Sequence, residues 1–560
     1  MTSQFSLWLY PLLVFAVFAC TLRSRLGLRW AWGFLLQILF IGFAAAYGLT
    51  IGPDWLFAFI GWGLFFVFIV IPRVLLSRLE HAISVLDARQ AARYSRQLRW
   101  FFWGEPGDFW HDIVVANTYF MQRKMEEATA VLNKWEQKQI PKIVRDTVAT
   151  YKLTGHAILG DWQGIVDQYE EACTASLSES QRASAAAGLF TAKDLQRHFS
   201  STVPHRLSLS ASRAYLELGE FEKGTQALEN ATLPESRLSA KAAGVTLLPF
   251  FCLLGALPQV KTLLKISQAG KQTLPEYTRI YWLARCYAAM GKEDQARELF
   301  LKCKELASGG PDSWRLRIDT QLARLDEGSV PPLPEAHEDY VRRAWAIFEK
   351  MVFVQDVIAP NRASPVVSGL IGVILVAHVA SAFSGTLHGV AIDFGSVQQQ
   401  LVLEGQYWRL VTYMFLHAHL SHVFMNVLML YWFGRVAENI FGTARFLTVF
   451  FVSGILSGVS HMLLSTDAAV GASGAVLGLF GAVAAGIFRL KDRIPPGIRR
   501  FELSFMGGVA LAQLILDQII PQVAAIAHIG GILAGFALGM IVGLAKPSKV
   551  LVEVEAAAPN

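Results

Sequence analysis

The segment GASGAVLGLFGAVAAGIF, residues 471–488, decides how the C-terminal part of this chain is interpreted. It opens on a small tetrapeptide around Ser473 and then stays apolar to its end. A second apolar segment contains AHIGG at residues 527–531, in which His528 follows Ser473 by 55 residues. Polar groups are costly at membrane depth, so an ionisable residue there indicates a functional site. Ser473 and His528 are therefore a candidate nucleophile and base inside a bilayer.

Composition supports a membrane protein with more than one domain. A chain of 560 residues is too long for a single hydrophobic core. The chain is 53% hydrophobic and 17% charged, with a mean hydropathy of +0.38, which is unusual for a soluble protein. The apolar residues gather in the first 75 and the last 200 residues, whereas the middle carries much of the charge. We predict an all-α, polytopic membrane protein whose membrane segments flank a soluble insert.

The charge and the cysteines exclude several classes of function. The net charge of +6 comes largely from bases beside apolar spans, as in cytoplasmic membrane loops, so we expect no nucleic-acid partner. The five cysteines are odd in number and contain no CxxC pair, which indicates a reducing compartment without a disulfide framework. We expect neither a metal nor a cofactor.

Apolar runs predict nine membrane-spanning helices, since each approaches the roughly 20 residues that a helix needs to cross a bilayer. Three precede the soluble middle and six follow it, at about 5–22, 31–51, 55–72, 366–386, 408–433, 446–464, 473–488, 503–520 and 523–544.

Basic residues occupy alternate loops and so predict the orientation. The basic loops lie at residues 23–29, 73–99, 342–362, 435–445 and 489–500. This pattern places the N-terminus outside and both the soluble middle and the C-terminus inside. Ser473 and His528 then lie within about 10 Å of the outer ends of their helices, at matching depth.

The soluble middle, residues 76–330, predicts a helical repeat domain on the cytoplasmic side. Gly219, Gly255 and Gly291 recur every 36 residues, each within a pattern of small and aromatic residues. These spacings resemble the tetratricopeptide repeat, which forms an α-solenoid with a concave surface for a protein or peptide ligand. The alternative is an ordinary helical domain whose aromatic residues are core. Residues 331–364, which begin with three prolines, are predicted to be a linker and juxtamembrane segment.

The predicted span 408–433 contains an unusual density of polar residues: His417, His419, His422 and Asn426. His422 and Asn426 are four residues apart and therefore share one helix face, from which both could donate to an oxyanion. The alternative is that such residues are inert, because serine packs helices closely and a buried histidine can bond a backbone carbonyl.

Five motifs in order make residues 355–545 resemble the rhomboid family of intramembrane serine proteases. They are Trp408-Arg409; His417, His422 and Asn426 as HxxxxHxxxN; Gly434, Glu438 and Gly442; Gly471-Ala472-Ser473-Gly474 as GxSG; and Ala527-His528 with Gly531 and Gly535. The resemblance implies a six-helix protease core at residues 365–545. It leaves three extra N-terminal membrane helices in residues 1–75 and a cytoplasmic tail at residues 546–560.

The resemblance implies a role for each matched residue. Ser473 is the nucleophile and His528 its general base, with no acidic third member required, while Gly531 and Gly535 allow the two helices to approach. His422, Asn426 and the Ser473 backbone N–H form the oxyanion hole. His417, Trp408, Arg409, Glu438, Gly471 and Gly474 are supporting residues. Leu477 stands where many members carry an aromatic residue that packs on the catalytic histidine.

The implied activity is cleavage of single-span membrane proteins near the outer leaflet of the bilayer, with the repeat domain recruiting substrates or partners. Two alternatives remain: a rhomboid-like pseudoprotease that binds clients without cleaving them, and a membrane scaffold that works through its repeat domain. The sequence favours a multi-pass protein of a bacterial inner membrane.

Overall fold

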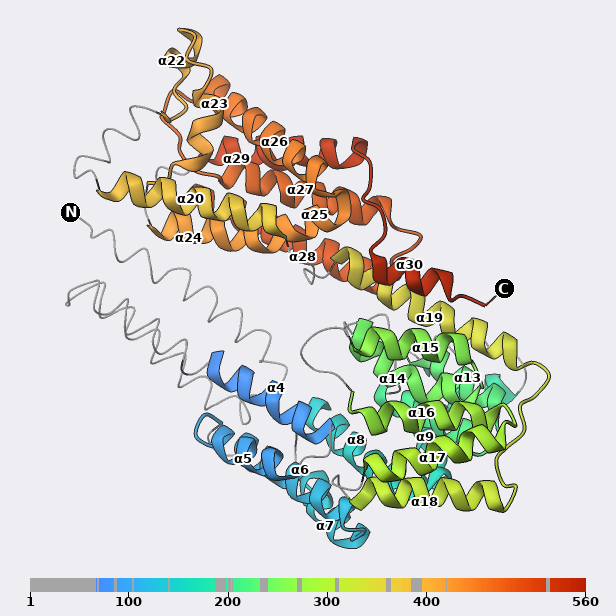
Figure 1. Ribbon diagram of the computed structural model, residues 1–560. Coiled ribbons are helices and arrows are strands. Elements are labelled where there is room, and N and C mark those ends of the chain that lie inside the picture. The colour runs from blue at the N-terminus through green and yellow to red at the C-terminus, as the bar shows by residue number, and fades with distance from the viewer. Residues whose placement is uncertain are drawn as a thin grey trace. The chain divides into compact units, whose positions relative to one another are not determined.

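Helices form nearly all the regular structure in the computed structural model (Figure 1). The described residues are 67, 70–84, 88–102, 105–138, 140, 142–186, 198–199, 203, 205–231, 240–268, 274–307, 312–358, 364–383, 395–418, 420–519 and 524–559. Within these ranges the β-structure is one isolated antiparallel bridge, between Val397 and Ala469. The predicted spans 5–22 and 31–51, and most of 55–72, lie outside the described residues. The chain divides into two compact units, one reaching to Phe348 and including Ala556–Asn560, the other comprising Glu349–Glu555.

The first unit is a series of consecutive helices. In chain order they are α4 (Ile71–Ser84), α5 (Ala88–Leu98), α6 (Glu105–Met121), α7 (Met125–Glu136), α8 (Lys142–Leu159), α9 (Trp162–Ser176), α10 (Glu179–Ala186), α12 (His205–Glu217), α13 (Phe221–Asn230), α14 (Ala240–Leu253), α15 (Leu257–Ser267), α16 (Glu276–Ala289), α17 (Glu293–Leu306) and α18 (Asp312–Asp326). Most pack against the next helix along the chain, as in a stack of hairpins.

The three periodic glycines lie at the turns of three successive hairpins. Gly219 joins α12 to α13, Gly255 joins α14 to α15, and Gly291 joins α16 to α17. Their φ angles are +84°, +64° and +71°, in the left-handed region that glycine adopts without the steric cost of a Cβ atom. The 36-residue period of the sequence therefore corresponds to the repeat of one helical hairpin.

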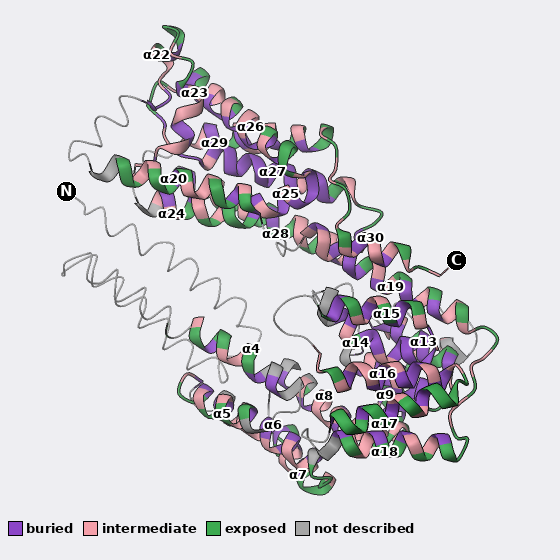
Figure 2. Cartoon of the chain, in the orientation of Figure 1, coloured by how far each residue is buried: buried purple, intermediate pink, exposed green. Residues whose placement is uncertain are grey.

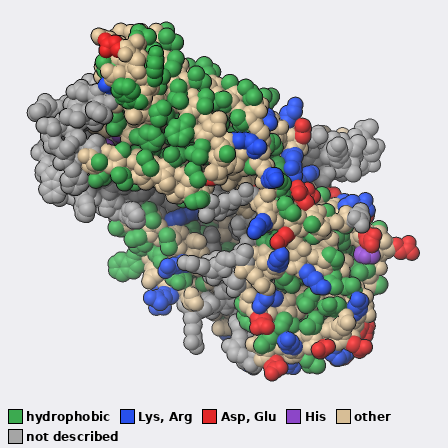
Figure 3. All heavy atoms as spheres, turned by 45° about the horizontal axis from the view of Figure 1, so that its top comes forward, with side chains coloured by type: hydrophobic (Ala, Val, Ile, Leu, Met, Phe, Trp, Pro, Cys, Tyr) green, Lys and Arg blue, Asp and Glu red, His purple; other side chains and the backbone are tan. Residues whose placement is uncertain are grey.

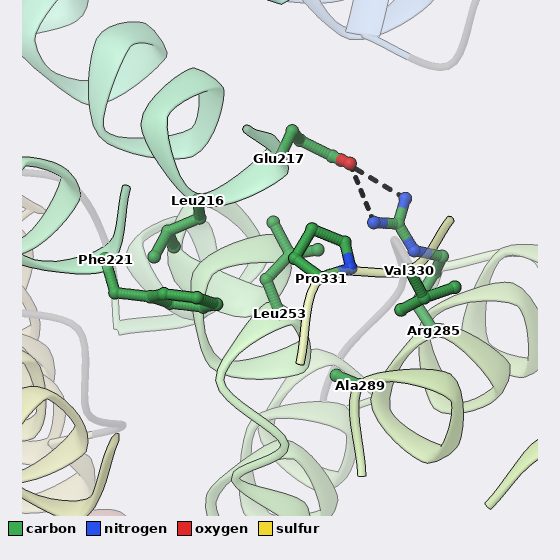
Figure 4. A pocket seen from close by; sticks show the side chains of 8 residues that line it. All are labelled: Leu216, Glu217, Phe221, Leu253, Arg285, Ala289, Val330 and Pro331. Atoms are coloured by element: carbon green, nitrogen blue, oxygen red, sulfur yellow. Dashed lines mark hydrogen bonds and ion pairs between the residues drawn. The ribbon is translucent and has the colours of Figure 1, made fainter. Parts of the chain in front are cut away.

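A buried ion-pair cluster joins several of these helices. The Glu217 side chain at the end of α12 is fully buried and accepts hydrogen bonds of 3.2 and 2.8 Å from the Arg285 guanidinium on α16. Arg324 on α18 donates to it as well, at 3.1 Å. Figure 4 shows the Glu217–Arg285 pair beside a cavity of about 10 Å³, which is room for about one water molecule. This cluster fixes the register between helices that are distant in sequence.

The segment 331–364, predicted to be a linker and juxtamembrane segment, is largely helical. Most of it forms the helix α19 (His337–Ile358), of which Trp345 and Phe348 are fully buried. The Trp345 ring contacts those of Phe251 and Phe348, each with a centroid separation of 5.2 Å. Aromatic burial thus stabilises a helix where the prolines upstream suggested an irregular connection. The predicted tail, residues 546–560, also contains a helix, α30 (Lys549–Ala556), with Leu551 and Val554 buried.

The second unit contains the helices that overlap the last six predicted spans, together with the short helix α25 between two of them. They are α20 (Pro365–Phe383), α24 (Leu420–Met429) with its π-helical continuation η6 (Leu430–Gly434), α25 (Arg435–Phe441), α26 (Thr443–Leu464), α27 (Ser473–Arg489), α28 (Pro496–Ile519) and α29 (Ala525–Ile541). A connecting segment before α24 forms three short helices, α22 (Gln399–Leu403), α23 (Arg409–Thr412) and η5 (Tyr413–Phe415).

Helix α27 is the centre of the second unit. It packs on both α26 and α29, and nearly all of its residues after Ser473 are buried, as the continuous purple of Figure 2 shows. A helix that is apolar on every side is typical of a buried or membrane-spanning position. The residue that opens this helix, Ser473, is therefore held by the best-packed element of the unit.

By length and composition, α26 is the one helix among the described residues that is long and apolar enough to cross a membrane. Helices α27 and α29 and the first part of α20 are shorter but equally apolar. On the face shown in Figure 3, hydrophobic and uncharged side chains predominate over the second unit, whereas charged side chains are scattered over the first.

The predicted span 408–433 is divided rather than continuous. Its first part forms α23 and η5, the chain is extended at Leu416, and a new helix begins at Leu420. The break is stabilised by contacts outside the helix: the Gly471 N–H donates to the Tyr413 carbonyl at 2.9 Å. Hydrophobicity alone does not reveal such a break, since it depends on a segment that lies far along the chain.

Candidate active site

The turn that leads into α27 positions Ser473. Gly471 has a φ of +128°, and a Cβ atom added there would lie 2.5 Å from the Cε1 atom of His422. The next N–H, that of Ala472, donates to Nε2 of His417 at 3.2 Å. A side chain at position 471 would therefore strain the backbone and displace the His422 ring. Two of the predicted supporting residues, Gly471 and His417, thus shape the approach to the serine.

Glycines bring α29 against α27. A Cβ atom at Gly531 would collide with the carbonyl oxygen of Gly474, and one at Gly535 with that of Gly478. These partners are backbone atoms that cannot move aside, so the two helices approach closely only because Gly531 and Gly535 lack side chains. His528, on the fourth residue of α29, is thereby held opposite the first residue of α27.

Ser473 and His528 are in hydrogen-bond contact. The Ser473 Oγ and His528 Nε2 atoms are 2.8 Å apart. His528 is 5% exposed, whereas Ser473 is half-buried and so is less enclosed than its partner. The hydroxyl and the imidazole are thus close enough for a proton to pass between them, as a serine nucleophile and its base require.

An acidic residue that the sequence analysis did not assign lies on the other side of the imidazole. Asp517, on α28, places its Oδ2 atom 2.8 Å from His528 Nδ1, and its side chain is 1% exposed. Its other oxygen, Oδ1, accepts a 2.7 Å hydrogen bond from Gln513 Nε2. The family resemblance requires no acidic third member, and this contact is an addition to the residues that it implies. Asp517 is the sole charged residue in the predicted span 503–520, which was the available signal.

The two predicted oxyanion donors lie on α24. The His422 ring lies over Gly471, two residues before Ser473, and meets the His417 ring edge-on at a centroid separation of 5.0 Å. Asn426 is buried, and its amide donates to the His422 carbonyl at 2.9 Å. A primary amide carries two N–H groups, so this hydrogen bond leaves one for another acceptor.

The remaining predicted supporting residues, Trp408, Arg409 and Glu438, lie on segments other than α27. Trp408 is exposed, whereas Arg409 is buried and donates to Gln406 at 2.7 Å and to the Ser396 carbonyl at 3.1 Å. Glu438 on α25 accepts a 2.7 Å hydrogen bond from the Thr443 hydroxyl across the turn at Gly442. These contacts order the segment before α24 and the turn into α26.

Two residues beside the site carry bulky side chains. Leu477, one turn after Ser473, is buried in α27. The Tyr413 hydroxyl donates to the Gly454 carbonyl of α26 at 2.6 Å, so this residue braces the segment that carries His417. Within the described ranges, no group of three or more His, Cys, Asp or Glu side chains could hold a metal ion.

Comparison with known proteins agrees with the geometry. The Rhomboid domain matches residues 404–545, which include all the residues in contact at the site. YdcA of Bacillus subtilis (strain 168), a rhomboid by name, is 30% identical over 142 residues, covering 25% of this chain and 69% of YdcA. The chain belongs to the rhomboid family. This is a membrane-protein family whose members are generally intramembrane serine proteases.

Two further relatives show how far the similarity to this rhomboid extends. Rhomboid protease GluP of Bacillus subtilis is 28% identical over 159 residues, and RHOMBOID-like protein 6, mitochondrial, of Arabidopsis thaliana is 34% identical over 161 residues. Each match covers 28% of this chain, but only 30% of the first relative and 52% of the second. The chain thus spans less than two thirds of either protein.

Proposed function

We propose that this rhomboid is an active intramembrane serine endopeptidase in which Ser473 is the nucleophile and His528 the general base. The observation that carries the proposal is the 2.8 Å contact between Ser473 Oγ and His528 Nε2 at the open end of a buried helix. Family membership supports the class of reaction, since rhomboids are generally serine proteases.

In the first half of the proposed reaction, Ser473 Oγ attacks the carbonyl carbon of the scissile peptide bond while its proton passes to His528 Nε2. A tetrahedral intermediate forms with negative charge on the former carbonyl oxygen. His528 then gives the proton to the leaving nitrogen, the C–N bond breaks, and the product amine departs. The remaining acyl group is attached to Ser473 as an ester.

In the second half, a water molecule replaces the amine. It transfers a proton to His528 Nε2 as its oxygen attacks the ester carbon, and the proton returns to Ser473 Oγ as the ester bond breaks. The products are a carboxylic acid and free Ser473.

The proposed oxyanion hole consists of the His422 ring, the Asn426 amide and the Ser473 backbone N–H. Support comes from the His422 ring over Gly471 and from the second N–H of Asn426. Ser473 is the first residue of α27, and the first N–H groups of a helix have no partner within it. Donors fixed before the reaction stabilise the developing charge without reorganisation.

The proposed substrates are single-span membrane proteins cut near the outer leaflet. Positive residues in alternate loops place the Ser473 end of α27 towards the outside, and the apolar helices of the second unit suit a bilayer. A substrate helix must unwind there to present an extended peptide bond, so small, helix-destabilising residues favour cleavage. A bacterial inner membrane is the proposed location.

The proposed role of the first unit is to recruit substrates or partners through a tetratricopeptide-like solenoid on the cytoplasmic side. The successive hairpins with glycine turns support this assignment, since stacked hairpins of this kind produce extended binding surfaces. The expected ligand is a protein or peptide. Deleting residues 76–330 should spare cleavage of a generic test substrate and impair that of a native one.

Cleavage of a purified single-span test substrate in lipid vesicles tests the proposed activity. The wild-type protein should cut, while Ser473→Ala and His528→Ala should each lose activity by at least about 1,000-fold. Ser460→Ala, which removes a hydroxyl bonded only to its own helix at Leu456, is the matched control and should cut normally. Binding of the substrate without cleavage by the wild type would instead support a pseudoprotease.

A further inference from the structure

Asp517 is the one charged side chain of α28 that lies at the proposed active site. It is buried near the end of α28, close to the short connection into α29, where His528 lies on the fourth residue. The two chain segments meet because consecutive helices joined by a short loop run antiparallel. Asp517 and His528 therefore come together although they lie on different helices.

Both carboxylate oxygens of Asp517 lie within hydrogen-bond distance of a neighbouring side chain. Gln513, one turn earlier on α28, donates its amide N–H to Oδ1, and Oδ2 faces His528 Nδ1 at 2.8 Å. An ionised carboxylate accepts hydrogen bonds and donates none, so it selects the imidazole form that carries its proton on Nδ1. The lone pair of Nε2 then points at the Ser473 hydroxyl, as a general base requires.

We propose that Asp517 is a positioning residue that completes a Ser473–His528–Asp517 relay and holds His528 in the tautomer able to accept the serine proton. This inference rests on the proposed function and deepens it, since the relay serves the same nucleophile. Asp517 takes no proton and touches no substrate. Its carboxylate stabilises the imidazolium that forms when Ser473 attacks, as the aspartate of soluble serine proteases does.

A purely structural explanation of Asp517 accounts for less of the geometry. The Gln513–Asp517 hydrogen bond within α28 satisfies one carboxylate oxygen, but it gives no reason for burying the other. In an apolar span a carboxylate is costly, and a hydrophobic residue of similar size would pack the same position at lower cost. The cost is offset if the second oxygen has a function, and that oxygen faces His528.

The proposed role of the Asp517–His528 contact also makes the reaction depend on the position of α28. This helix exposes Leu511 and Ile515 on either side of Gln513, and within the described part of the chain no neighbouring atom lies within 4 Å of a Cβ added at Gly507 or Gly508. Ser473, His528 and Asp517 belong to α27, α29 and α28 respectively. The complete relay therefore exists only when the C-terminal end of α28 is docked on α29.

Kinetics of full-length Asp517→Asn in lipid vesicles test the inference. The amide can donate to Nδ1 and so favours the wrong tautomer, from which we expect kcat to fall about 100- to 10,000-fold with KM within about threefold. Asp517→Glu should recover part of kcat. The control Glu502→Gln removes an acid from the other end of α28, about 22 Å away along the helix, and should keep wild-type kcat.

A spectroscopic readout separates positioning from mere support of the fold. With ¹⁵N-labelled histidine, the His528 signals should show the Nδ1–H tautomer in the wild type and the Nε2–H tautomer in Asp517→Asn. The double variant Asp517→Ala/His528→Ala should be no slower than His528→Ala, because Asp517 acts through the imidazole.

Two outcomes would overturn the inference while leaving the proposed function intact: wild-type kcat in both Asp517→Asn and Asp517→Ala while Ser473→Ala is inactive, or an unchanged His528 tautomer in Asp517→Asn. Failure of the wild type itself to cleave would overturn the proposed function instead.

Discussion

Two buried polar clusters in this protein look alike in composition and differ in their organisation. Around Glu217, a fully buried carboxylate is bonded by Arg285 and Arg324, with every strong donor directed at the same acceptor. Around His528, Asp517 contacts Nδ1 of the imidazole and Ser473 contacts Nε2. The contacts therefore form a linear series that ends at half-buried Ser473. The Glu217 cluster contains no nucleophile, whereas the series of contacts at His528 ends in the Ser473 hydroxyl. Burial and charge alone therefore do not distinguish a structural cluster from a catalytic one.

The largest expected effect concerns the ion-pair cluster around Glu217. Glu217→Gln should destabilise the first unit by about 3–5 kcal/mol, because the arginines lose the charge that compensates their burial. Hydrogen exchange over α12 to α17 in the full-length chain measures this change. If the cluster is only structural, cleavage of a generic test substrate per folded molecule stays at the wild-type rate. A specific loss of kcat would break the contrast between the two clusters.

The same cluster should give the first unit a characteristic response to acid. Burial raises the pKa of Glu217, but the charges of Arg285 and Arg213 outweigh it and lower the pKa from 4.5 to about 2. A depressed pKa stabilises the fold fully above pH 4.5 and progressively less as the pH falls towards 2. Glu217→Gln should remove this part of the pH dependence of stability, measured by the same exchange experiment between those two pH values.

The next effect concerns the two side chains proposed as oxyanion donors. His422→Ala and Asn426→Ala should each lower kcat about 100- to 1,000-fold, since each removes one donor to the developing oxyanion. Single-turnover cleavage measures the chemical step directly. Loss of substrate binding with an unchanged chemical step would mean that these residues contact the substrate rather than the transition state.

Separation of the two central helices should have a somewhat smaller effect. Gly535→Ala places a methyl group against the Gly478 backbone, and the resulting shift of α29 moves His528 away from Ser473. A displacement of about 1 Å costs about 100-fold in rate. Gly508→Ala adds the same methyl group at a position with no neighbouring atom of the described residues within 4 Å, and is the matched control. Equal activity of both variants would show that the close approach of α27 and α29 is not needed.

The smallest effect should come from the brace beside the site. Tyr413→Phe removes the hydrogen bond to the Gly454 carbonyl and should cost about 0.5–1.5 kcal/mol of stability in the second unit, with kcat within about threefold. Thermal unfolding in detergent, followed by tryptophan fluorescence, measures the stability. A large loss of kcat at unchanged stability would place the Tyr413 hydroxyl in the chemistry.

Apolar runs in the sequence predict most helices of the second unit, and the ordered family motifs predict the Ser473–His528 contact. The GxSG and AHxxG motifs place both residues near helix starts, and the glycines that permit their approach are part of the same motifs. The hairpin turns at Gly219, Gly255 and Gly291 were likewise visible as a period. In each case the information lies within one element and its neighbours.

Features that depend on contacts between distant segments were missed. No family motif includes position 517, although an isolated acid in an apolar span indicates a functional residue. The break before α24 depends on Gly471 bonding Tyr413, and the helix α19 depends on Trp345 packing on Phe251. Such partners are far apart in the chain, so propensity and hydropathy do not reveal them.

Labelling by a fluorophosphonate probe tests the central claim most directly, because the probe reacts only with an activated serine and needs no substrate. Peptide mass spectrometry should find the phosphonate on Ser473 in the wild type and in Ser460→Ala. Labelling should be absent in Ser473→Ala and strongly slowed in His528→Ala. Wild-type protein that stays unlabelled at Ser473, or a His528→Ala variant labelled at the wild-type rate, would contradict the account.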